Sequence, residues 1–340
     1  MPKTMWAQTL TAPFRFEREE VPAPTAADLA PGQVLLRLLA AGVCGSDLPF
    51  FKGTPTPRAS LEDGRLRNPP GAPVHEVAGE VLASADHGLE PGERVVGWAS
   101  GANGLAEYVI TNATDVVRYD ERLKPEQAIL LQPLACVLHA VGELGPLEGV
   151  RAAVIGQGPI GLLFSHTLKS AGAARVTGVD RVDRSDVAAD FGVDECVLAT
   201  SGAWAVQYAT NGWAIQATAE SDAPGLIVEA VGHQTQTLTD AANALAMGGH
   251  LYYFGIPDDH VYPFPMATFL RKNARMTTGV TPADRKRSSL ARADRYVASH
   301  PGLADRYVTH VLSVNEATKA FRMATDPRPG QVKVVVTAQA

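Results

Sequence analysis

The stretch RAAVIGQGPIGLLFSHTLKSAG, residues 151–172, decides the fold of the central part of the chain. It joins an apolar run of strand length to a run of helix length through Gly156, Gly158 and Gly161, which match the pattern G-x-G-x-x-G. In this pattern the first glycine permits a tight turn, the second lets the backbone approach a pyrophosphate, and the third lets the helix pack on the strand. The hexapeptide is weak evidence alone, but between a strand and a helix it predicts a dinucleotide-binding turn.

The residues around this turn add to the prediction. Pro159 and Ile160 open the expected helix, whose free N–H groups and positive dipole end attract phosphates. Asp180 closes the next apolar run, RVTGVD, about 20 residues further on, where a carboxylate accepts hydrogen bonds from ribose hydroxyls. The same carboxylate repels a 2′-phosphate and so favours NAD over NADP, although Arg181 and Arg184 could partly offset that repulsion. The alternative is a glycine turn in an unrelated α/β fold, with Asp180 as a helix N-cap.

The alternation of strand-like and helix-length runs continues to about residue 282. Strand-like runs recur at ECVLA, GLIVEAVG, HLYYFGI and ARMTTGV, and SDVAADFG and QTLTDAANALAMGG are long enough for helical segments. Such alternation is typical of parallel strands with helices on both faces. We therefore predict an α/β fold whose Rossmann domain, a doubly wound parallel sheet, covers residues 146–282.

The rest of the chain follows a different pattern. Residues 1–145 contain short apolar runs broken by Gly and Pro, such as QVLLRLLAAGVC and GERVVGWAS, and predict a compact β-rich domain. Within it, residues 52–73 have no periodicity and predict a long loop. Residues 283–340 predict two helices and two strands, at 285–299, 307–313, 315–325 and 331–338.

Composition narrows the possible functions. The chain has 340 residues, 46% of them hydrophobic, and a formal net charge of −6, with both signs scattered along the sequence. This balance offers no basic surface for nucleic acid or for a membrane. The N-terminus lacks a signal-peptide pattern, and three widely spaced cysteines do not form a disulfide framework. We expect a cytoplasmic protein with no nucleic-acid or membrane partner.

A candidate metal site comes from two stretches, GVCGSDLPFFKG (42–53) and VHEVAGEV (74–81). Cys44, His75 and Glu76 provide the thiolate, imidazole and carboxylate that zinc takes as ligands in catalytic sites, which keep a fourth position open. Each residue alone has an ordinary explanation: a buried cysteine, a loop histidine, a solvated glutamate. Successive side chains of a strand point to opposite faces, so His75 and Glu76 can share a metal only if the backbone turns between them.

The motifs AAGVCGSDLPFF, VHEVAGEV, PGERVVGWAS, LLQPLACVLHAV, AAVIGQGPIGLL, GVDRVDR and THVLSVNEATKAF occur in order along nearly the whole chain. This series resembles the zinc-dependent medium-chain alcohol and polyol dehydrogenases, the branch that contains sorbitol and threonine dehydrogenases. The resemblance implies a GroES-like catalytic domain made of both chain ends, with the Rossmann domain inserted between them, and a homodimer or homotetramer. It places Cys44, His75 and Glu76 at zinc-binding positions, Ser46 as the hydroxyl that passes the substrate proton outward, and Asp47 as a partner near the metal.

Several positions depart from the family pattern. No four-cysteine lobe follows GERVVGWAS, so we expect no structural zinc. Gln132 stands where relatives usually have a Glu in or beside the zinc sphere, and we expect it as a direct or water-mediated fourth ligand. Pro49 replaces a frequent His of the proton path, and Val74 replaces the usual Gly before the zinc histidine. These departures concern metal affinity and the proton route.

The expected activity is reversible oxidation of a secondary alcohol (a polyol, a sugar-derived alcohol or an amino alcohol) to a ketone, with NAD and one catalytic zinc. The first alternative is a zinc-free reductase of the same superfamily, acting on a C=C or C=N bond. The second is a non-catalytic relative that binds NAD. The Cys, His and Glu set favours the zinc enzyme over both alternatives, and the identity of the small-molecule substrate stays open.

Overall fold

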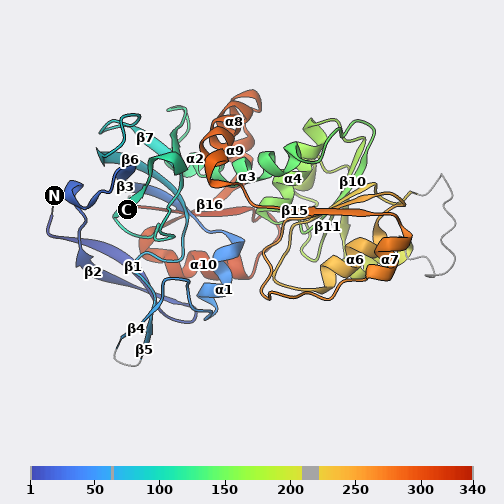
Figure 1. Cartoon of the computed structure of the whole chain (residues 1–340), viewed down its shortest axis with the longest axis horizontal. Helices are drawn as coiled ribbons and strands as arrows, with labels where there is room; N and C mark the ends of the chain where they lie inside the picture. Colours follow the sequence, from blue (N-terminus) through green and yellow to red (C-terminus); the bar gives the residue numbers. More distant parts are fainter. Residues whose placement is uncertain (1, 63–64, 209–221, 339–340) are drawn as a thin grey trace. The chain divides into compact units, whose positions relative to one another are not determined.

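The computed structural model describes residues 2–62, 65–208 and 222–338, and these form two compact units (Figure 1). The first unit contains both ends of the chain, and the second contains the middle together with Arg328–Gly330. The units divide after Cys136 and after Val280, whereas the sequence predicts divisions after 145 and after 282. The first division falls inside helix α3 (Leu131–Gly142), where the sequence around Cys136 is a continuous apolar run with no loop signal.

The second unit is a six-stranded parallel sheet in the order β12-β11-β10-β13-β14-β15. Its strands are β10 (Arg151–Ile155), β11 (Arg175–Asp180), β12 (Glu195–Leu198), β13 (Leu226–Glu229), β14 (His250–Tyr253) and β15 (Arg275–Thr278). Its further helices are α4 (Pro159–Ser170), α5 (Ser201–Ala205), α6 (Gln236–Ala244) and α7 (Met266–Arg271). The strand order reverses between β10 and β13, which is where doubly wound sheets bind dinucleotides at the carboxyl ends of the strands. The predicted α/β class and parallel sheet are confirmed.

The glycine-rich turn takes the form that the sequence predicts. Strand β10 ends at Ile155, and Gly156 follows with φ of +88°, a conformation that favours glycine. Helix α4 begins at Pro159, with Gly158 as its N-cap. A Cβ added at Gly161 would lie 1.7 Å from the carbonyl oxygen of Gly156, so only glycine lets the helix approach the strand this closely.

The first unit is built on a seven-stranded sheet in the order β16-β17-β3-β6-β7-β9, with β8 paired to β3. Its strands are β3 (Gln33–Gly42), β6 (Glu76–Ser84), β7 (Arg94–Trp98), β8 (Tyr108–Asn112), β9 (Val116–Arg118), β16 (Val308–Ser313) and β17 (Lys333–Thr337), beside a separate hairpin of β1 (Thr4–Ala12) and β2 (Arg15–Pro22). Its helices are α1 (Leu48–Phe51), α2 (Pro125–Ala128), the start of α3, α8 (Lys286–Ser299), α9 (Leu303–Tyr307) and α10 (Ala317–Thr325). Strand β17 pairs antiparallel with β3, so the two ends of the chain build one sheet.

Aromatic packing joins the same two ends. Phe16 stacks on Phe51 with ring centroids 5.6 Å apart, and Phe321 of α10 lies 4.8 Å from Phe16 and 5.0 Å from Phe51. All three side chains are buried in one apolar cluster with Leu38 and Val334. Burying a large aromatic side chain stabilises a fold by roughly 1.5–3 kcal/mol, so this cluster secures the C-terminal segment to the N-terminal sheet.

Two local predictions were wrong. Residues 52–73 contain a short hairpin, β4 (Ser60–Glu62) with β5 (Arg65–Arg67), because three-residue strands are too short to show a period of two. The run SDVAADFG forms only a 3-10 turn, Ala188–Phe191, which ends at Gly192 in the left-handed region. Among the described residues, none of the helices combines the length and the apolar character needed to cross a bilayer.

Candidate metal centre and dinucleotide site

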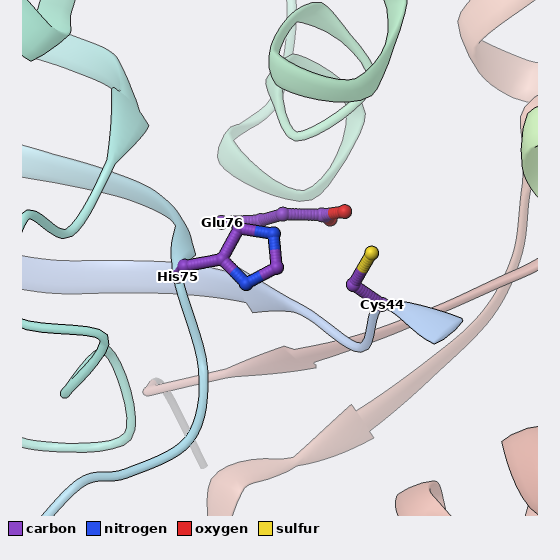
Figure 2. Close-up of side chains that lie close together, drawn as sticks. All are labelled: Cys44, His75 and Glu76. Carbon is purple, nitrogen blue, oxygen red and sulfur yellow. The ribbon is translucent and has the colours of Figure 1, made fainter. Parts of the chain in front are cut away.

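The register of the first sheet brings the candidate metal ligands together. Strand β3 ends at Gly42, which pairs with Glu76, the first residue of β6. Cys44 follows β3 and leads into a 3-10 turn, Gly45–Asp47, while His75 directly precedes β6. One ligand atom of each of Cys44, His75 and Glu76 lies within 4.8 Å of the others (Figure 2). Because His75 stands outside the strand, the alternation of side chains within β6 does not separate it from Glu76.

Asp47 holds this arrangement in place. Its Oδ2 accepts the backbone N–H of Cys44 at 3.0 Å, and its Oδ1 lies 3.0 Å from Nδ1 of His75. A carboxylate accepts hydrogen bonds, so Nδ1 carries the proton and Nε2 keeps a lone pair for a metal. A carboxylate that orients a ligating histidine in this way is a common partner of zinc sites. Asp47 is almost completely buried, so its orientation is fixed by the surrounding protein.

The electrostatics of His75 reflect these neighbours. Burial acts to lower the pKa of its imidazole, but the Asp47 carboxylate and the Cys44 sulfur raise that pKa by more, and the net shift is strongly upward. Without a metal, a proton therefore favours the position that a metal would take. Zinc binding must release that proton, which makes metal affinity rise with pH.

The residues present fit a catalytic zinc. Ligand atoms of tetrahedral zinc lie roughly 3.3–3.8 Å apart, given bonds of about 2.0–2.3 Å, so the observed cluster needs only a small inward movement. One thiolate, one imidazole and one carboxylate form a mixed set that leaves a position for substrate. Ser46 Oγ donates a hydrogen bond to Cys44 Sγ at 3.3 Å, which puts a hydroxyl beside the first ligand.

Sequence reasoning missed Lys333, the partner of Glu76. Its Nζ donates to Glu76 Oε1 at 2.8 Å and lies 2.6 Å from Oε2, and both side chains are almost completely buried. A Cβ at Gly42 would lie 2.1 Å from Glu76 Oε2, so the glycine makes room for this carboxylate. The signal was a lysine within the apolar run QVKVVVTA, because a buried lysine requires a charged partner.

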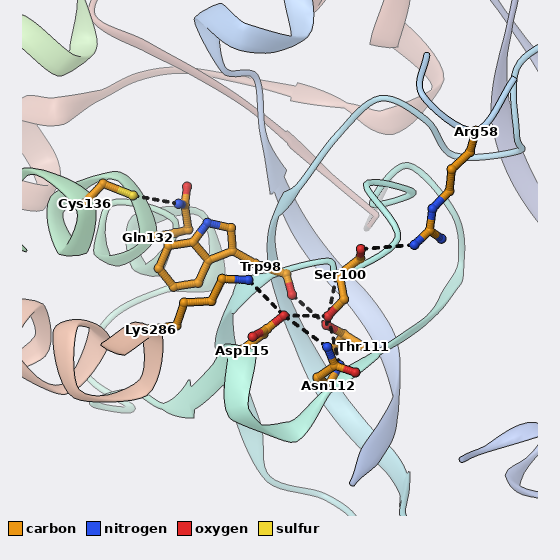
Figure 3. A network of polar contacts seen from close by, with 9 residues as sticks. All are labelled: Arg58, Trp98, Ser100, Thr111, Asn112, Asp115, Gln132, Cys136 and Lys286. Atoms are coloured by element: carbon orange, nitrogen blue, oxygen red, sulfur yellow. Dashed lines mark hydrogen bonds and ion pairs between the residues drawn. The ribbon is translucent and has the colours of Figure 1, made fainter. Parts of the chain in front are cut away.

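Gln132 and Cys136 lie one turn apart on α3. Gln132 is buried, and its Nε2 donates to Cys136 Sγ at 3.4 Å (Figure 3). Burial raises the pKa of the Cys136 thiol to about 11, and the charges of His75, Cys44 and Glu76 also act on it, so this part of α3 borders the metal centre. Ligation of a metal by Gln132 stays a prediction.

A further buried carboxylate, that of Asp115, has a structural role. Its Oδ2 accepts a hydrogen bond from Ser100 Oγ at 2.7 Å and lies 3.0 Å from Lys286 Nζ (Figure 3). The Lys286 ammonium also lies 5.2 Å from the centre of the Trp98 ring. The ion pair of Lys286 with Asp115 links α8 to the N-terminal sheet. Because Lys286 neutralises the charge of Asp115, we assign this network a structural role and not a catalytic one.

In the second unit, Asp180 lies at the end of β11 next to the glycine-rich turn. Its Oδ2 accepts the backbone N–H of Gln157 at 2.6 Å, and its Oδ1 accepts that of Val182 at 2.9 Å. The carboxylate is thus fixed in orientation, with further lone pairs for other donors. Arg181 is exposed, whereas Arg184 is buried and its guanidinium donates to the carbonyl of Arg328 at 3.4 Å.

Gln157 lies inside the glycine motif, and the sequence did not indicate its structural role. Its side chain is fully buried, donates to the carbonyl of Val154 at 3.1 Å and accepts from Ser165 Oγ at 3.1 Å. A Cβ at Gly178 would come within 2.7 Å of its amide carbon. The glutamine therefore fastens the turn to β10, α4 and β11, leaving the backbone of the turn as the surface for a phosphate.

Comparison with known families agrees with the fold. The chain matches the Glucose dehydrogenase C-terminus family over residues 128–338 and the Alcohol dehydrogenase GroES-like domain over residues 30–121. It is 31% identical over 281 residues to D-altritol 5-dehydrogenase of Agrobacterium fabrum, covering 72% of this chain and 76% of that protein. It is 25% identical over 318 residues to D-arabinitol dehydrogenase 1 of Uromyces fabae, covering 85% and 86%. Among solved structures, an alcohol dehydrogenase of Thermus sp. ATN1 superposes with a TM-score of 0.79 at 22% identity, covering 98% of this chain and all of that one.

The fold and site thus define a two-unit dehydrogenase with a GroES-like domain and a Rossmann domain. The chain belongs to the zinc-type medium-chain alcohol and polyol dehydrogenase family.

The buried ion pair yields a prediction. Replacing Lys333 with Met leaves the Glu76 carboxylate buried without its partner, which costs about 3–5 kcal/mol in the zinc-free protein. Bound zinc would offset part of that uncompensated charge, so we expect a larger loss of Tm without zinc than with it. Thermal unfolding of both forms measures this. Lys319→Met, which removes an exposed pair with Glu316, is the control and should change Tm little. An equal loss of Tm for Lys333→Met with and without zinc would show that Lys333 does not act on the metal centre.

Proposed function

We propose that the protein oxidises a secondary alcohol reversibly to a ketone, with NAD as the hydride acceptor and one catalytic zinc. The observation that carries the proposal is the convergence of Cys44, His75 and Glu76 in a chain that also has a Rossmann glycine turn. A zinc-free reductase would have no need of this ligand set.

Cys44, His75 and Glu76 would hold the zinc, with Asp47 orienting His75. Zinc, when bound, supplies Lewis acidity that lowers the pKa of an alcohol. The three cysteines of the sequence are too few for a four-cysteine structural site, which supports a single zinc per chain. Gln132 is a neutral amide, so as a fourth ligand it would bind more weakly than the glutamate of relatives.

Ser46 is suited to receive the substrate proton. Its side chain is half-buried, and its hydroxyl can rotate about the Cβ–Oγ bond. A serine Oγ both donates and accepts hydrogen bonds, so it can take a proton and pass one on. In this structure the hydroxyl donates to Cys44 Sγ, which leaves the lone pairs of Oγ for the proton of a bound alcohol. Ser46 would be the first carrier in a relay toward solvent: its hydroxyl would turn from Cys44 Sγ and release its own proton to the next acceptor as it takes the proton of the alcohol.

The orientation of Asp180 supports NAD. Two backbone N–H groups fix the carboxylate at the end of β11, where it would accept hydrogen bonds from ribose hydroxyls and repel a 2′-phosphate. Of the two arginines that could offset this repulsion, Arg184 is buried and directed to Arg328, so Arg181 alone is exposed.

The relatives support a substrate class. Two of them are named for the oxidation of polyols, an altritol and an arabinitol, and both match over most of their length. We propose a polyol or sugar-derived alcohol as the substrate. An amino alcohol is the next class to test.

A homodimer is supported by the edge of the second sheet. As far as the structure describes it, this sheet ends at β15, whose four residues are all exposed. Exposed apolar side chains occur on this strand and in the segments that flank it in sequence, with exposed fractions of 62% for Met266, 70% for Leu270, 44% for Met276 and 75% for Val280. A free strand edge with apolar neighbours is a surface that a second copy can cover.

The zinc assignment has a direct test. We expect about one zinc per purified chain, and we expect Cys44→Ser to lose both the zinc and polyol oxidation while NAD still binds. Metal analysis, a spectrophotometric screen of polyols and NAD titration measure the three properties. Cys196→Ser, which changes the cysteine of β12, is the matched control and should keep all three. An active enzyme that holds no metal and tolerates Cys44→Ser would instead support a zinc-free reductase.

Cofactor choice is tested at β11. Asp180→Ser removes the charge that disfavours a 2′-phosphate, so the ratio of kcat/KM for NAD over NADP should fall at least tenfold. Asp183→Ser is the control, because the described hydrogen bonds of Asp183 all come from the nearby Ser185. A wild-type enzyme that prefers NADP would refute the assignment.

The homodimer is tested by light scattering of the eluting protein. Wild type should elute as a dimer or a multiple of it, and the double variant Leu270→Glu, Met276→Glu should dissociate because it places charges in the apolar edge. Leu198→Glu, on the opposite edge strand β12 and 61% exposed, is the control and should stay assembled. A wild-type monomer at micromolar concentration would exclude this interface.

A further inference from the structure

Tyr307, the last residue of α9, has a buried hydroxyl without a partner. Its side chain is fully buried, and its hydroxyl makes no hydrogen bond within the described part of the chain. Native proteins rarely leave a buried hydroxyl unsatisfied, and such groups usually meet a water, an ion or a second conformation of a neighbour. The hydroxyl therefore requires an acceptor that this structure does not pair with it.

The topology places Tyr307 behind the metal centre. The residue after it, Val308, pairs with Lys333 in the register of β16 and β17, and Lys333 is the partner of Glu76. The surroundings of the hydroxyl agree: burial raises the pKa of Tyr307, and the charge of Glu76 raises it further, ahead of those of Cys44 and Cys136. Glu76 is thus the acidic group that acts most strongly on Tyr307.

Glu76 has an unsatisfied atom of the complementary kind. Its Oε2 lies 2.6 Å from Lys333 Nζ but forms no hydrogen bond of favourable geometry with any described residue. An ionised carboxylate can accept about four hydrogen bonds, and in the protein interior each oxygen needs at least one. The Tyr307 hydroxyl, a buried donor without an acceptor, and Glu76 Oε2, a buried acceptor without a donor, therefore both lie near the metal centre.

We propose that Tyr307 is a positioning residue of the metal centre, whose hydroxyl donates to the Glu76 carboxylate, directly or through one buried water. Lys333 and a metal compete for this carboxylate, since each is a cation that it can neutralise. A hydrogen bond from Tyr307 holds Glu76 when it turns from Lys333 toward the metal. Tyr307 thus acts through Glu76 and touches neither substrate nor cofactor. The proposal rests on the zinc role proposed above for Glu76.

Zinc affinity of the full-length protein, measured by competition with a chelator, tests the proposal. Tyr307→Phe should raise the Kd for zinc about tenfold, in the range seen when an outer partner of a zinc ligand is removed. The Tm of the zinc-free variant should not fall, because the substitution deletes a hydroxyl that has no partner in that state. In a Glu76→Gln background, where the carboxylate is absent, Tyr307→Phe should change the Kd less than twofold.

Tyr119→Phe is the matched control. Tyr119 is also buried with an unpartnered hydroxyl in the same unit, but the charges that act on it are those of Arg94, Glu126 and Glu121. This variant should leave the Kd for zinc unchanged.

The outcomes separate the two proposals. A wild-type protein that binds no zinc would overturn the proposed function together with this inference. A wild-type protein that binds zinc, with an unchanged Kd in Tyr307→Phe, would overturn this inference alone. A tenfold rise in the Kd for zinc that persists in the Glu76→Gln background would also overturn this inference. So would an equal loss of Tm in the zinc-free and zinc-loaded forms of Tyr307→Phe.

Discussion

The Asp47 carboxylate is the interaction on which the candidate metal centre depends. One oxygen accepts the N–H of Cys44 and the other faces Nδ1 of His75, so a single buried group fixes two ligands that are 31 residues apart. A buried carboxylate is strongly destabilising unless it is hydrogen-bonded, so its position admits little variation. The orientation of His75, the proton on Nδ1 and the lone pair on Nε2 all follow from it.

A second buried charge, on Glu76, links the metal centre to the end of the chain. Lys333 comes from β17, which pairs with β3, the strand that leads to Cys44. With Cys44 as a thiolate, Asp47 and Glu76 as carboxylates, Lys333 as an ammonium and His75 neutral, the cluster would carry a net charge of about −2, which a divalent metal would neutralise. Without a metal, a proton on His75 takes over part of that neutralisation, so zinc and protons compete for the centre.

The local features of the fold could be predicted from sequence because they depend on neighbours in the chain. Gly156, through its positive φ, and Gly161, through its close approach to Gly156, specify the turn by steric limits, and Asp180 falls at a fixed distance after it. The candidate metal ligands could be proposed from residue type and from the family resemblance, but the local pattern did not show how they converge, because His75 and Glu76 would diverge within one strand. In the structure β6 begins at Glu76, so His75 lies outside the strand and the two side chains can converge. The start of β6 depends on the pairing of Glu76 with Gly42.

The features that sequence did not predict depend on contacts between distant segments. The pairing of Lys333 with Glu76 joins residues 257 apart, and the position of Tyr307 becomes significant only through the register of β16 and β17. The hairpin within residues 52–73 was missed for a different reason, since its strands are too short to have a pattern. Local sequence thus indicates the chemistry of this site, and tertiary pairing determines which groups orient it.

X-ray absorption at the zinc edge tests the central claim most directly, because it reports the atoms around the metal without reference to any substrate. For the purified protein the account predicts a single sulfur at about 2.3 Å and nitrogen or oxygen atoms at about 2.0–2.2 Å. The sulfur contribution should be absent from any zinc retained by Cys44→Ser. A zinc shell without sulfur in the wild type, or a sulfur contribution that survives Cys44→Ser, would contradict the assignment of Cys44, His75 and Glu76 as the metal ligands.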